Sequence, residues 1–490
     1  MRTEKSGGIL QKNGVSKEIS GIVQKSQGVN SMAGIGFELR RIFKRNTLAS
    51  ALWGTFFATV TTIGPTVTFV ILLFVLRFVM NYYGTDIGDK EFFVASFTYA
   101  FLTAVLIASV MNAVVSRFIS DKIFEEKESD IGASIFGVMT VGTVAAGIVF
   151  LILCFLMYQT DQVSMPFLMA YYCLGVLATN TFNLMAYVTA LKEYKEVTFS
   201  YLAGLLVAIP VFYLLFSLSG FSILFSLYVS LAAGFFVVDL LLLFFCIRAF
   251  GMPATRIFEF LRYFRRYPEL AITGFCYMLG FYISNIIYWN FSELRVQTNI
   301  FWTAPSYDLA MFGAILVNLP ALVIFVVKAE TIFYEKYVQY LSALNKGSYI
   351  LIEKRRANMQ NTLKLQLFFV YEVQLIITIL VICAANLAFP LLGIGTYVFN
   401  LFMVLSLGVY CTLSMYLTIL YLYYFEDYRH AAIVAVLYLL VETVGAILCA
   451  NLSGPFYPLP LLAAGVTGWL AAFLFLRRRL VTLNGYLLCK

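Results

Sequence analysis

Long apolar runs alternate with short polar segments along almost the whole chain. Twelve of these runs reach the roughly 20 residues that a helix needs to cross the hydrocarbon core of a bilayer. Six precede and six follow the basic connector Arg248–Pro268. Because six is an even number, both halves begin on the same side of the bilayer. The predicted spans are Leu48–Met80, Phe93–Val115, Ile131–Tyr158, Pro166–Ala190, Val197–Leu218, Phe221–Ile247, Glu269–Trp289, Tyr307–Val327, Gln366–Phe389, Tyr397–Phe425, Ala431–Leu452 and Leu459–Leu476.

This pattern predicts an all-α polytopic membrane protein with twelve transmembrane helices in two six-helix bundles that form a parallel repeat. Residues 48–250 form the N-terminal bundle and residues 269–480 the C-terminal bundle, joined by the linker 251–268. Many secondary transporters use this layout and carry their substrate between the two halves. We therefore expect the substrate path of this chain to lie between the bundles.

Basic residues fix the predicted orientation. With the N-terminus in the cytoplasm, 31 of the 34 Lys and Arg residues lie in inner segments, and Lys90, Arg295 and Arg77 are the exceptions. Cytoplasmic loops carry such an excess of Lys and Arg. The sequence therefore predicts that both termini, including the tail 481–490, are cytoplasmic. The net charge of +8 is explained by this bias and needs no nucleic-acid partner.

Composition agrees with a membrane protein and excludes several chemistries. Hydrophobic residues make up 61% of the chain and charged residues only 12%. A soluble domain of this composition would expose far too much apolar surface. The eight Cys residues form no CxxC pair, His430 is the single His, and no phosphate-binding loop motif is present. We expect neither a metal site, nor a cofactor, nor enzymatic activity.

The N-terminal region contains two unlike segments before the first span. Residues 1–31 are rich in Gly, Ser, Gln and Lys and have little apolar surface to bury, so we expect disorder. Residues 32–47 alternate apolar and basic side chains, which suits a segment that lies on an anionic membrane surface or simply anchors the first span. Gly64 and Pro65 interrupt that span, and a bend there is a candidate hinge, although such kinks are often static.

The longest inner loop, residues 328–365, is strongly amphipathic. Its apolar residues follow the spacing of one helical face, and a second helix can start at Ser348 and run toward span nine. This helical hairpin could dock a cytoplasmic partner or lie on the membrane surface. The candidate docking residues are Phe333, Tyr337, Leu341 and Leu344.

Ionisable residues inside spans are costly and are candidates for a transport function. Glu442 lies near the middle of span eleven, where a proton, a cation or a polar cavity must compensate the charge. It could couple transport to protons or sodium, or have a structural role. Asp239 and Glu372 lie closer to the predicted inner ends, where a structural role is favoured.

Span seven carries an aromatic strip on one helical face. Tyr277, Phe281, Asn285 and Tyr288 recur at helical spacing, which would present stacking surfaces and an amide to a sugar. The alternatives are packing between helices for the amide and an aromatic belt at the outer interface for Tyr288. We include these four residues among the path candidates.

The segments MAGIGFELR at Met32, the Gly64-Pro65 break, SYDLAMFGAILVNLP at Ser306, KAETIFYEKY at Lys328 and LYYFEDYR at Leu422 resemble the PelG family. This family belongs to the multidrug/oligosaccharidyl-lipid/polysaccharide exporter (MOP) superfamily and exports the Pel exopolysaccharide of biofilms. The family usually begins at the residue that matches Met32, so residues 1–31 are an extension or reflect a different start. The resemblance implies assembly with a cytoplasmic glycosyltransferase and with membrane subunits that respond to cyclic di-GMP.

We therefore expect an exporter of an amino-sugar exopolysaccharide. Two alternatives with the same fold remain, a flippase for lipid-linked oligosaccharides and a drug/cation antiporter. In a further alternative, the chain is mainly an assembly platform for partners that secrete the polymer.

Overall fold

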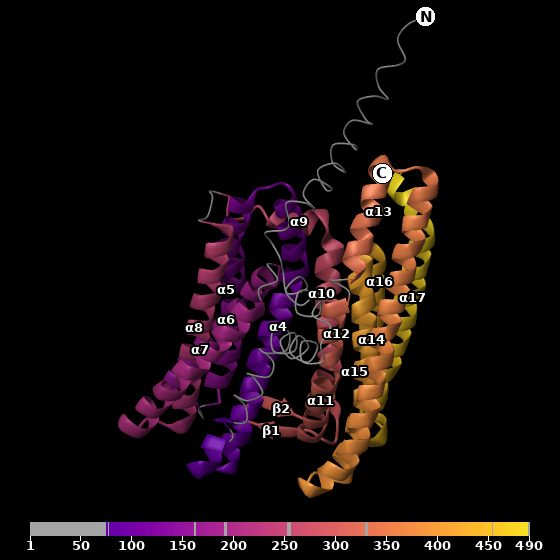
Figure 1. Cartoon of the computed structure of the whole chain (residues 1–490). Coiled ribbons are helices and arrows are strands. Elements are labelled where there is room, and N and C mark those ends of the chain that lie inside the picture. The colour runs from indigo at the N-terminus through magenta and orange to yellow at the C-terminus, as the bar shows by residue number, and fades with distance from the viewer. Residues whose placement is uncertain are drawn as a thin grey trace, which may run out of the picture. The chain divides into compact units, whose positions relative to one another are not determined.

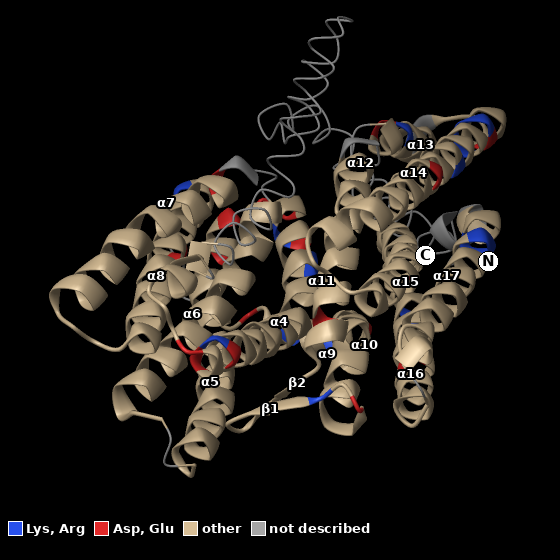
Figure 2. Ribbon diagram, turned by 90° about the horizontal axis from the view of Figure 1, so that it is seen from below, with Lys and Arg blue, Asp and Glu red and all other residues tan. Residues whose placement is uncertain are grey.

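A computed structural model describes residues 75–76, 78–160, 163–190, 194–251, 256–328, 332–452 and 454–488. The predictions for residues 1–47 and for the Gly64-Pro65 hinge lie outside these ranges. The described residues are helical almost throughout. Eleven of the helices that they form are long and apolar enough to cross a membrane. These eleven correspond to the predicted spans two to twelve. In Figure 2 the ribbon segments of Lys, Arg, Asp and Glu are sparse along the bodies of the helices.

The elements that the structure describes follow the predicted order (Figure 1). They are α4 (Ile87–Phe124), α5 (Glu128–Tyr158), α6 (Met165–Ala190), α7 (Tyr194–Tyr213), η2 (Leu214–Leu218), α8 (Ile223–Phe250), α9 (Leu261–Arg266), α10 (Pro268–Phe291), β1 (Val296–Thr298), β2 (Phe301–Thr303), α11 (Pro305–Asn318), α12 (Pro320–Lys328), α13 (Tyr334–Lys346), α14 (Tyr349–Leu391), α15 (Thr396–Tyr424), α16 (Tyr428–Ala450), η4 (Gly454–Phe456) and α17 (Leu459–Leu488).

Helices α4 to α8 pack into the first bundle, in which α6 contacts α4, α5 and α8. Small residues allow the close approaches, as is usual where lipid removes the hydrophobic drive between helices. Gly204 on α7 faces Gly234 on α8, and a Cβ at Gly204 would lie 2.7 Å from the carbonyl oxygen of Gly234. Near one end of the bundle, aromatic side chains that include Tyr171 and Tyr228 fill the core.

The connector packs on one end of the first bundle. Glu259 accepts a hydrogen bond from Nζ of Lys122 at 2.9 Å, and Lys122 also donates to Asp130 at 3.0 Å. Gly137 lets the backbone approach, because a Cβ there would overlap the carbonyl oxygen of Ile257. Glu259, the only acidic residue of the predicted linker, therefore attaches the linker to Lys122 on α4. We call this end of the molecule the connector end.

Helices α10, α11, α15, α16 and α17 pack together as the second bundle. Predicted span eight is interrupted where α11 ends at Asn318 and Pro320 begins α12, because Pro lacks the N–H that a continuous helix needs. The Asn318 side chain donates to the carbonyl oxygen of Ser406 on α15 at 3.0 Å. The interruption is thus fastened to a neighbouring helix.

The two bundles meet along α4 and α10. Gly274 on α10 permits this contact, because a Cβ there would overlap the carbonyl oxygen of Ser109 on α4. At the connector end, Arg117 on α4 pairs with Glu426 at 3.0 Å and donates to the hydroxyl of Tyr428 at 2.8 Å. Residue 426 has a φ of 53°, and this left-handed turn separates α15 from α16.

The described residues of the segment Pro320–Ile376 form a compact unit distinct from the rest. The predicted hairpin of helices is present in it as α13 and the start of α14. Arg355 donates to the side chain of Gln339 at 2.8 Å and so ties the two helices together. Helix α14 then continues without interruption through predicted span nine to Leu391.

Candidate functional site

Glu442 lies fully buried in the second bundle. Its Oε1 accepts a hydrogen bond from Ser284 on α10, whereas its Oε2 has no partner. The hydroxyl of Tyr307 on α11 is also buried and unpaired. Within the part of the chain that the structure describes, no basic side chain pairs with this carboxyl. A buried carboxyl without a basic partner is stabilised when it is protonated or when it binds a cation.

Asp308 on α11 is a half-buried carboxylate that the sequence analysis did not select. It accepts hydrogen bonds from Asn285 Nδ2 at 2.7 Å, from Trp289 Nε1 at 3.0 Å and from the backbone N–H of Ala304 at 3.1 Å. Three donors can stabilise its charged form without a cation. The sequence feature that could have identified Asp308 is its position as an acid in the first turn of a helix that begins at Pro305.

The aromatic strip of span seven lies mostly within the second bundle. Tyr288 is fully buried and donates its hydroxyl to the carbonyl oxygen of Tyr457 at 2.8 Å. It therefore lies in the protein core and not in an interfacial belt. Asn285 is also buried, while Tyr277 and Phe281 are half-buried. The ring of Tyr277 stacks on that of Tyr416, with centroids 4.7 Å apart. Only the first half of the strip is thus partly open.

Asp239 occupies an equivalent chemical setting in the first bundle. It is buried inside the bundle, against α6. Its Oδ1 accepts from the hydroxyl of Thr181 on α6, and its Oδ2 has no partner. Each bundle therefore contains one carboxyl that is held by a single hydroxyl and keeps one oxygen free.

The remaining predicted residues lie in the unit Pro320–Ile376. Glu372 is exposed on the surface of α14. Of the candidate docking residues, Phe333 is fully buried and stacks on Tyr337 at 5.9 Å. Tyr337 is half-buried, as are the other two residues of the set, Leu341 and Leu344. Phe333 therefore stabilises the unit and offers no surface to a partner.

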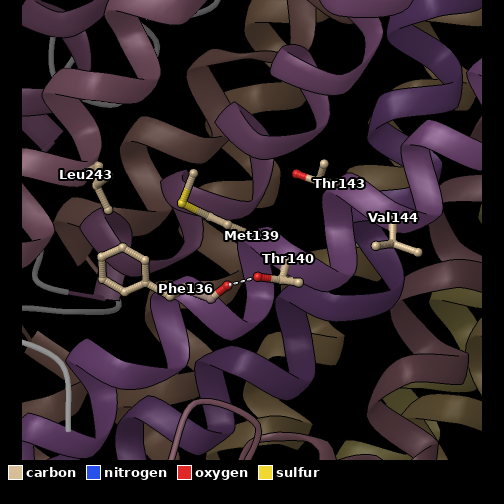
Figure 3. Close-up of a pocket in the computed structure, with 6 residues that line it drawn as sticks. All are labelled: Phe136, Met139, Thr140, Thr143, Val144 and Leu243. Atoms are coloured by element: carbon tan, nitrogen blue, oxygen red, sulfur yellow. Dashed lines mark hydrogen bonds between the residues drawn. The ribbon is translucent and has the colours of Figure 1, made fainter. Parts of the chain in front are cut away.

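One open cavity of about 310 Å³ lies on the first bundle between α5 and α8 (Figure 3). Thr140 and Thr143 are its polar residues. Thr140 donates its hydroxyl to the carbonyl oxygen of Phe136 at 2.7 Å, and Thr143 accepts from Asn180 at 2.9 Å. With its hydroxyls already bonded and no charged residue in its lining, this cavity is a weaker candidate than the buried carboxyls. Its lining residues are Phe136, Met139, Thr140, Thr143, Val144 and Leu243.

The described residues contain no cluster of three or more His, Cys, Asp or Glu side chains that could hold a metal ion. The arrangement is suited to movement of protons or monovalent cations, because its carboxyl and hydroxyl oxygens are buried in helices that cross a membrane. The single His, His430, bonds to Asp427 at 2.7 Å in the turn before α16.

A sequence model of the PelG family, described as "Putative exopolysaccharide Exporter (EPS-E)", matches residues 32–487. The chain belongs to the PelG family. The match begins at Met32, where the sequence resemblance begins, and covers all the described spans. PelG proteins are transporters, so this member is not an enzyme. No curated protein sequence matches the chain.

Solved structures of MATE transporters share the fold of this PelG family member. An outward-facing multidrug resistance MATE transporter of the MOP superfamily is 11% identical, covers 87% of this chain and 96% of its own, and has a TM-score of 0.62. A MATE protein in the bent conformation is 12% identical, with coverage of 92% and 98% and a TM-score of 0.61. A eukaryotic MATE transporter is 13% identical, with coverage of 88% and 96% and a TM-score of 0.56. The predicted class of an all-α polytopic membrane protein is confirmed, with eleven candidate spans among the described residues.

Proposed function

We propose that this PelG family member exports an amino-sugar exopolysaccharide across the bacterial cytoplasmic membrane during synthesis of a biofilm matrix. The observation that carries the proposal is the family match over nearly the whole chain. The bundles that meet along α4 and α10 supply two walls for a polymer path. Tyr277 and Phe281 are half-buried on α10 and are our candidates for stacking on sugar rings.

The proposal includes coupling of export to a proton or a monovalent cation at Glu442. A carboxyl buried among transmembrane helices is expensive unless it is compensated, and this one keeps an unpaired oxygen. Binding of a proton or cation there would change the contact with Ser284, which lies on the helix that packs against the first bundle. Asp239 is a second candidate because it has the same hydrogen-bonding pattern.

Glu442→Gln tests the coupling in a strain that lacks its own exporter and is complemented with this chain. Glutamine keeps the size and an oxygen acceptor for Ser284 but cannot exchange a proton, so we expect polymer secretion to fall at least about tenfold with normal protein in the membrane. Glu372→Gln is the matched control and should leave secretion unchanged. Undiminished secretion by Glu442→Gln removes the coupling role and leaves the export function intact.

Docking of a cytoplasmic glycosyltransferase and of cyclic di-GMP-responsive subunits is proposed at the start of α14. If span nine begins at Gln366, the preceding part of α14 extends about 25 Å beyond the hydrocarbon core, at 1.5 Å per residue. Tyr349 and Ile350 are largely exposed at its tip. In a co-purification with the glycosyltransferase, Ile350→Ser should reduce recovery, whereas Leu365→Ser, an exposed residue at the start of the span, should not.

A drug/cation antiporter is the second candidate, because the similar solved structures are MATE transporters. At 9–13% identity this likeness concerns the fold only. The two functions predict different phenotypes. Expression in a drug-sensitive host raises resistance if the chain is an antiporter, and restores secreted polymer in the deletion strain if it is an exporter. If the chain is instead a flippase for lipid-linked oligosaccharides, its deletion should deplete the pool of lipid-linked sugars on the outer side of the membrane.

A further inference from the structure

The two-stranded hairpin β1–β2 lies in the part of the sequence that forms the second bundle, between α10 and α11. Its strands nevertheless contact α4 of the first bundle as well as α10. The hairpin lies at the end of the molecule opposite the connector end. Val296 pairs with Thr303 and Thr298 with Phe301 in its antiparallel register. Asn299, in the turn, has a φ of 56°, a conformation that Asn tolerates better than most residues.

Phe301 at the tip enters the core of the first bundle. It is 1% exposed, and its ring centroid lies 4.8 Å from that of Tyr99 on α4 and 6.1 Å from that of Phe92. Two polar contacts hold the same hairpin. The Tyr99 hydroxyl donates to the carbonyl oxygen of Trp302 at 2.9 Å, and Asn299 Nδ2 donates to the Thr160 hydroxyl, just after α5, at 3.0 Å.

The base of the hairpin is fixed to the second bundle by Asp308. Its carboxylate accepts from the backbone N–H of Ala304, directly after β2, and from Trp289 on α10. The Trp289 ring in turn stacks on Tyr99, with centroids 4.7 Å apart. The half-buried carboxylate of Asp308 therefore links the hairpin base, α10 and the contact with α4.

We propose that the hairpin is a latch that closes the substrate path at its outer end, with Phe301 as the side chain that fastens it and Asp308 as the residue that positions its base. A two-stranded ribbon of three residues per strand is only marginally stable by itself, so its ordered shape depends on docking. The bundles cannot separate at this end while Phe301 stays in the first bundle. The outer opening of the path thus requires Phe301 to leave.

The latch is tested by a reversible cross-link in the full-length protein in membranes. Thr160→Cys and Asn299→Cys place two thiols at positions whose side chains now form a hydrogen bond. We expect oxidation to form this cross-link and to reduce polymer secretion at least about tenfold, and a reductant to restore secretion. The two single-Cys variants control for the native cysteines and should remain uncross-linked and active.

Phe301→Ala provides a second, independent measurement. Truncating a buried Phe shifts the docked equilibrium by about a hundredfold or more, so the rate of cross-linking in the double-Cys variant should fall. Phe291→Ala, at an exposed residue at the end of α10, should not change the rate. If Phe301→Ala does not accumulate, the double-Cys variant still tests the latch.

The latch is overturned if no cross-link forms in membranes, because the hairpin is then not docked. It is also overturned if the cross-linked protein secretes normally, because the path then opens without release of the hairpin. Failure of the proposed export function gives a different result, in which the unmodified chain restores no secretion even before oxidation. The cross-linking rates of Phe301→Ala and Phe291→Ala still decide the docking in that case.

Discussion

Removal of the Lys122 charge should destabilise the first bundle more than any exposed lysine could. The Lys122 side chain is only 4% exposed and lies between the carboxylates of Asp130 and Glu259. Lys122→Met keeps the length and the apolar stem of the side chain. It leaves two carboxylates close together in a partly dehydrated site, where each has lost its cation.

Loss of one partner from a buried ion pair costs about 3–5 kcal/mol. Because both carboxylates keep some exposure to water, we expect Lys122→Met to cost about 3 kcal/mol, at the lower end of that range. The free energy of unfolding in mixed micelles, followed as the SDS fraction rises, measures this loss. Adding Glu259→Gln should recover at least about 1 kcal/mol, because the substitutions act on one network.

Lys127→Met is the matched control. Its side chain is 57% exposed and pairs with Glu125 at 3.0 Å, so its loss should cost less than about 1 kcal/mol. Equal stabilities for the two variants would show that the Lys122 cluster is well hydrated and does not attach the connector. Additive effects of Lys122→Met and Glu259→Gln would refute the ion pair itself.

Two further predictions follow from close packing and from the distribution of charge. Gly137→Ser should destabilise the protein by about 1–3 kcal/mol, because its Cβ would overlap the carbonyl oxygen of Ile257. A Cβ at Gly395 meets open space, and the residue is the N-cap of α15, where Ser is favourable. Gly395→Ser should therefore leave the free energy of unfolding in the same SDS titration unchanged. Cysteines introduced at Lys90 and Lys346 should differ in labelling by a membrane-impermeant maleimide added to intact cells. The first is expected to react and the second to stay protected, and labelling of both at the same rate would contradict the predicted topology.

The sequence was sufficient to predict the spans because each one is a long apolar run, and a membrane leaves few alternatives to a helix. The eleven candidate spans of the described residues agree with the prediction. The break after Asn318 is visible in the sequence only as Pro320, which does not show whether the helix bends or ends. Helix α13 was predictable for a different reason, because its apolar residues repeat with helical spacing.

The site was less predictable because its contacts join residues that are far apart in the chain. Glu442 was found because a charge inside an apolar run is conspicuous. Its partner Ser284 is one of many serines, and no local pattern distinguishes it. Asp308 was overlooked because it lies at the start of a span, where an acid is ordinary near a helix N-terminus. The docking of Phe301 in the other bundle leaves no periodic signal in a three-residue strand.

Asp308 and Glu442, two carboxyls of the second bundle, differ in the number of hydrogen-bond donors that they accept from. We propose different roles for them on this basis. Asp308 has N–H donors on both oxygens, so a change of its protonation would break bonds that hold the hairpin base and α10. Glu442 has a single hydroxyl partner on one oxygen, so binding of a proton or cation would change only its contact with Ser284 on α10. Ser284 and Asn285, the partners of the two carboxyls, are consecutive on α10. A shift of α10 driven by exchange at Glu442 would therefore act directly on the group that holds the latch, which is how occupancy of the buried site could control opening at the outer end.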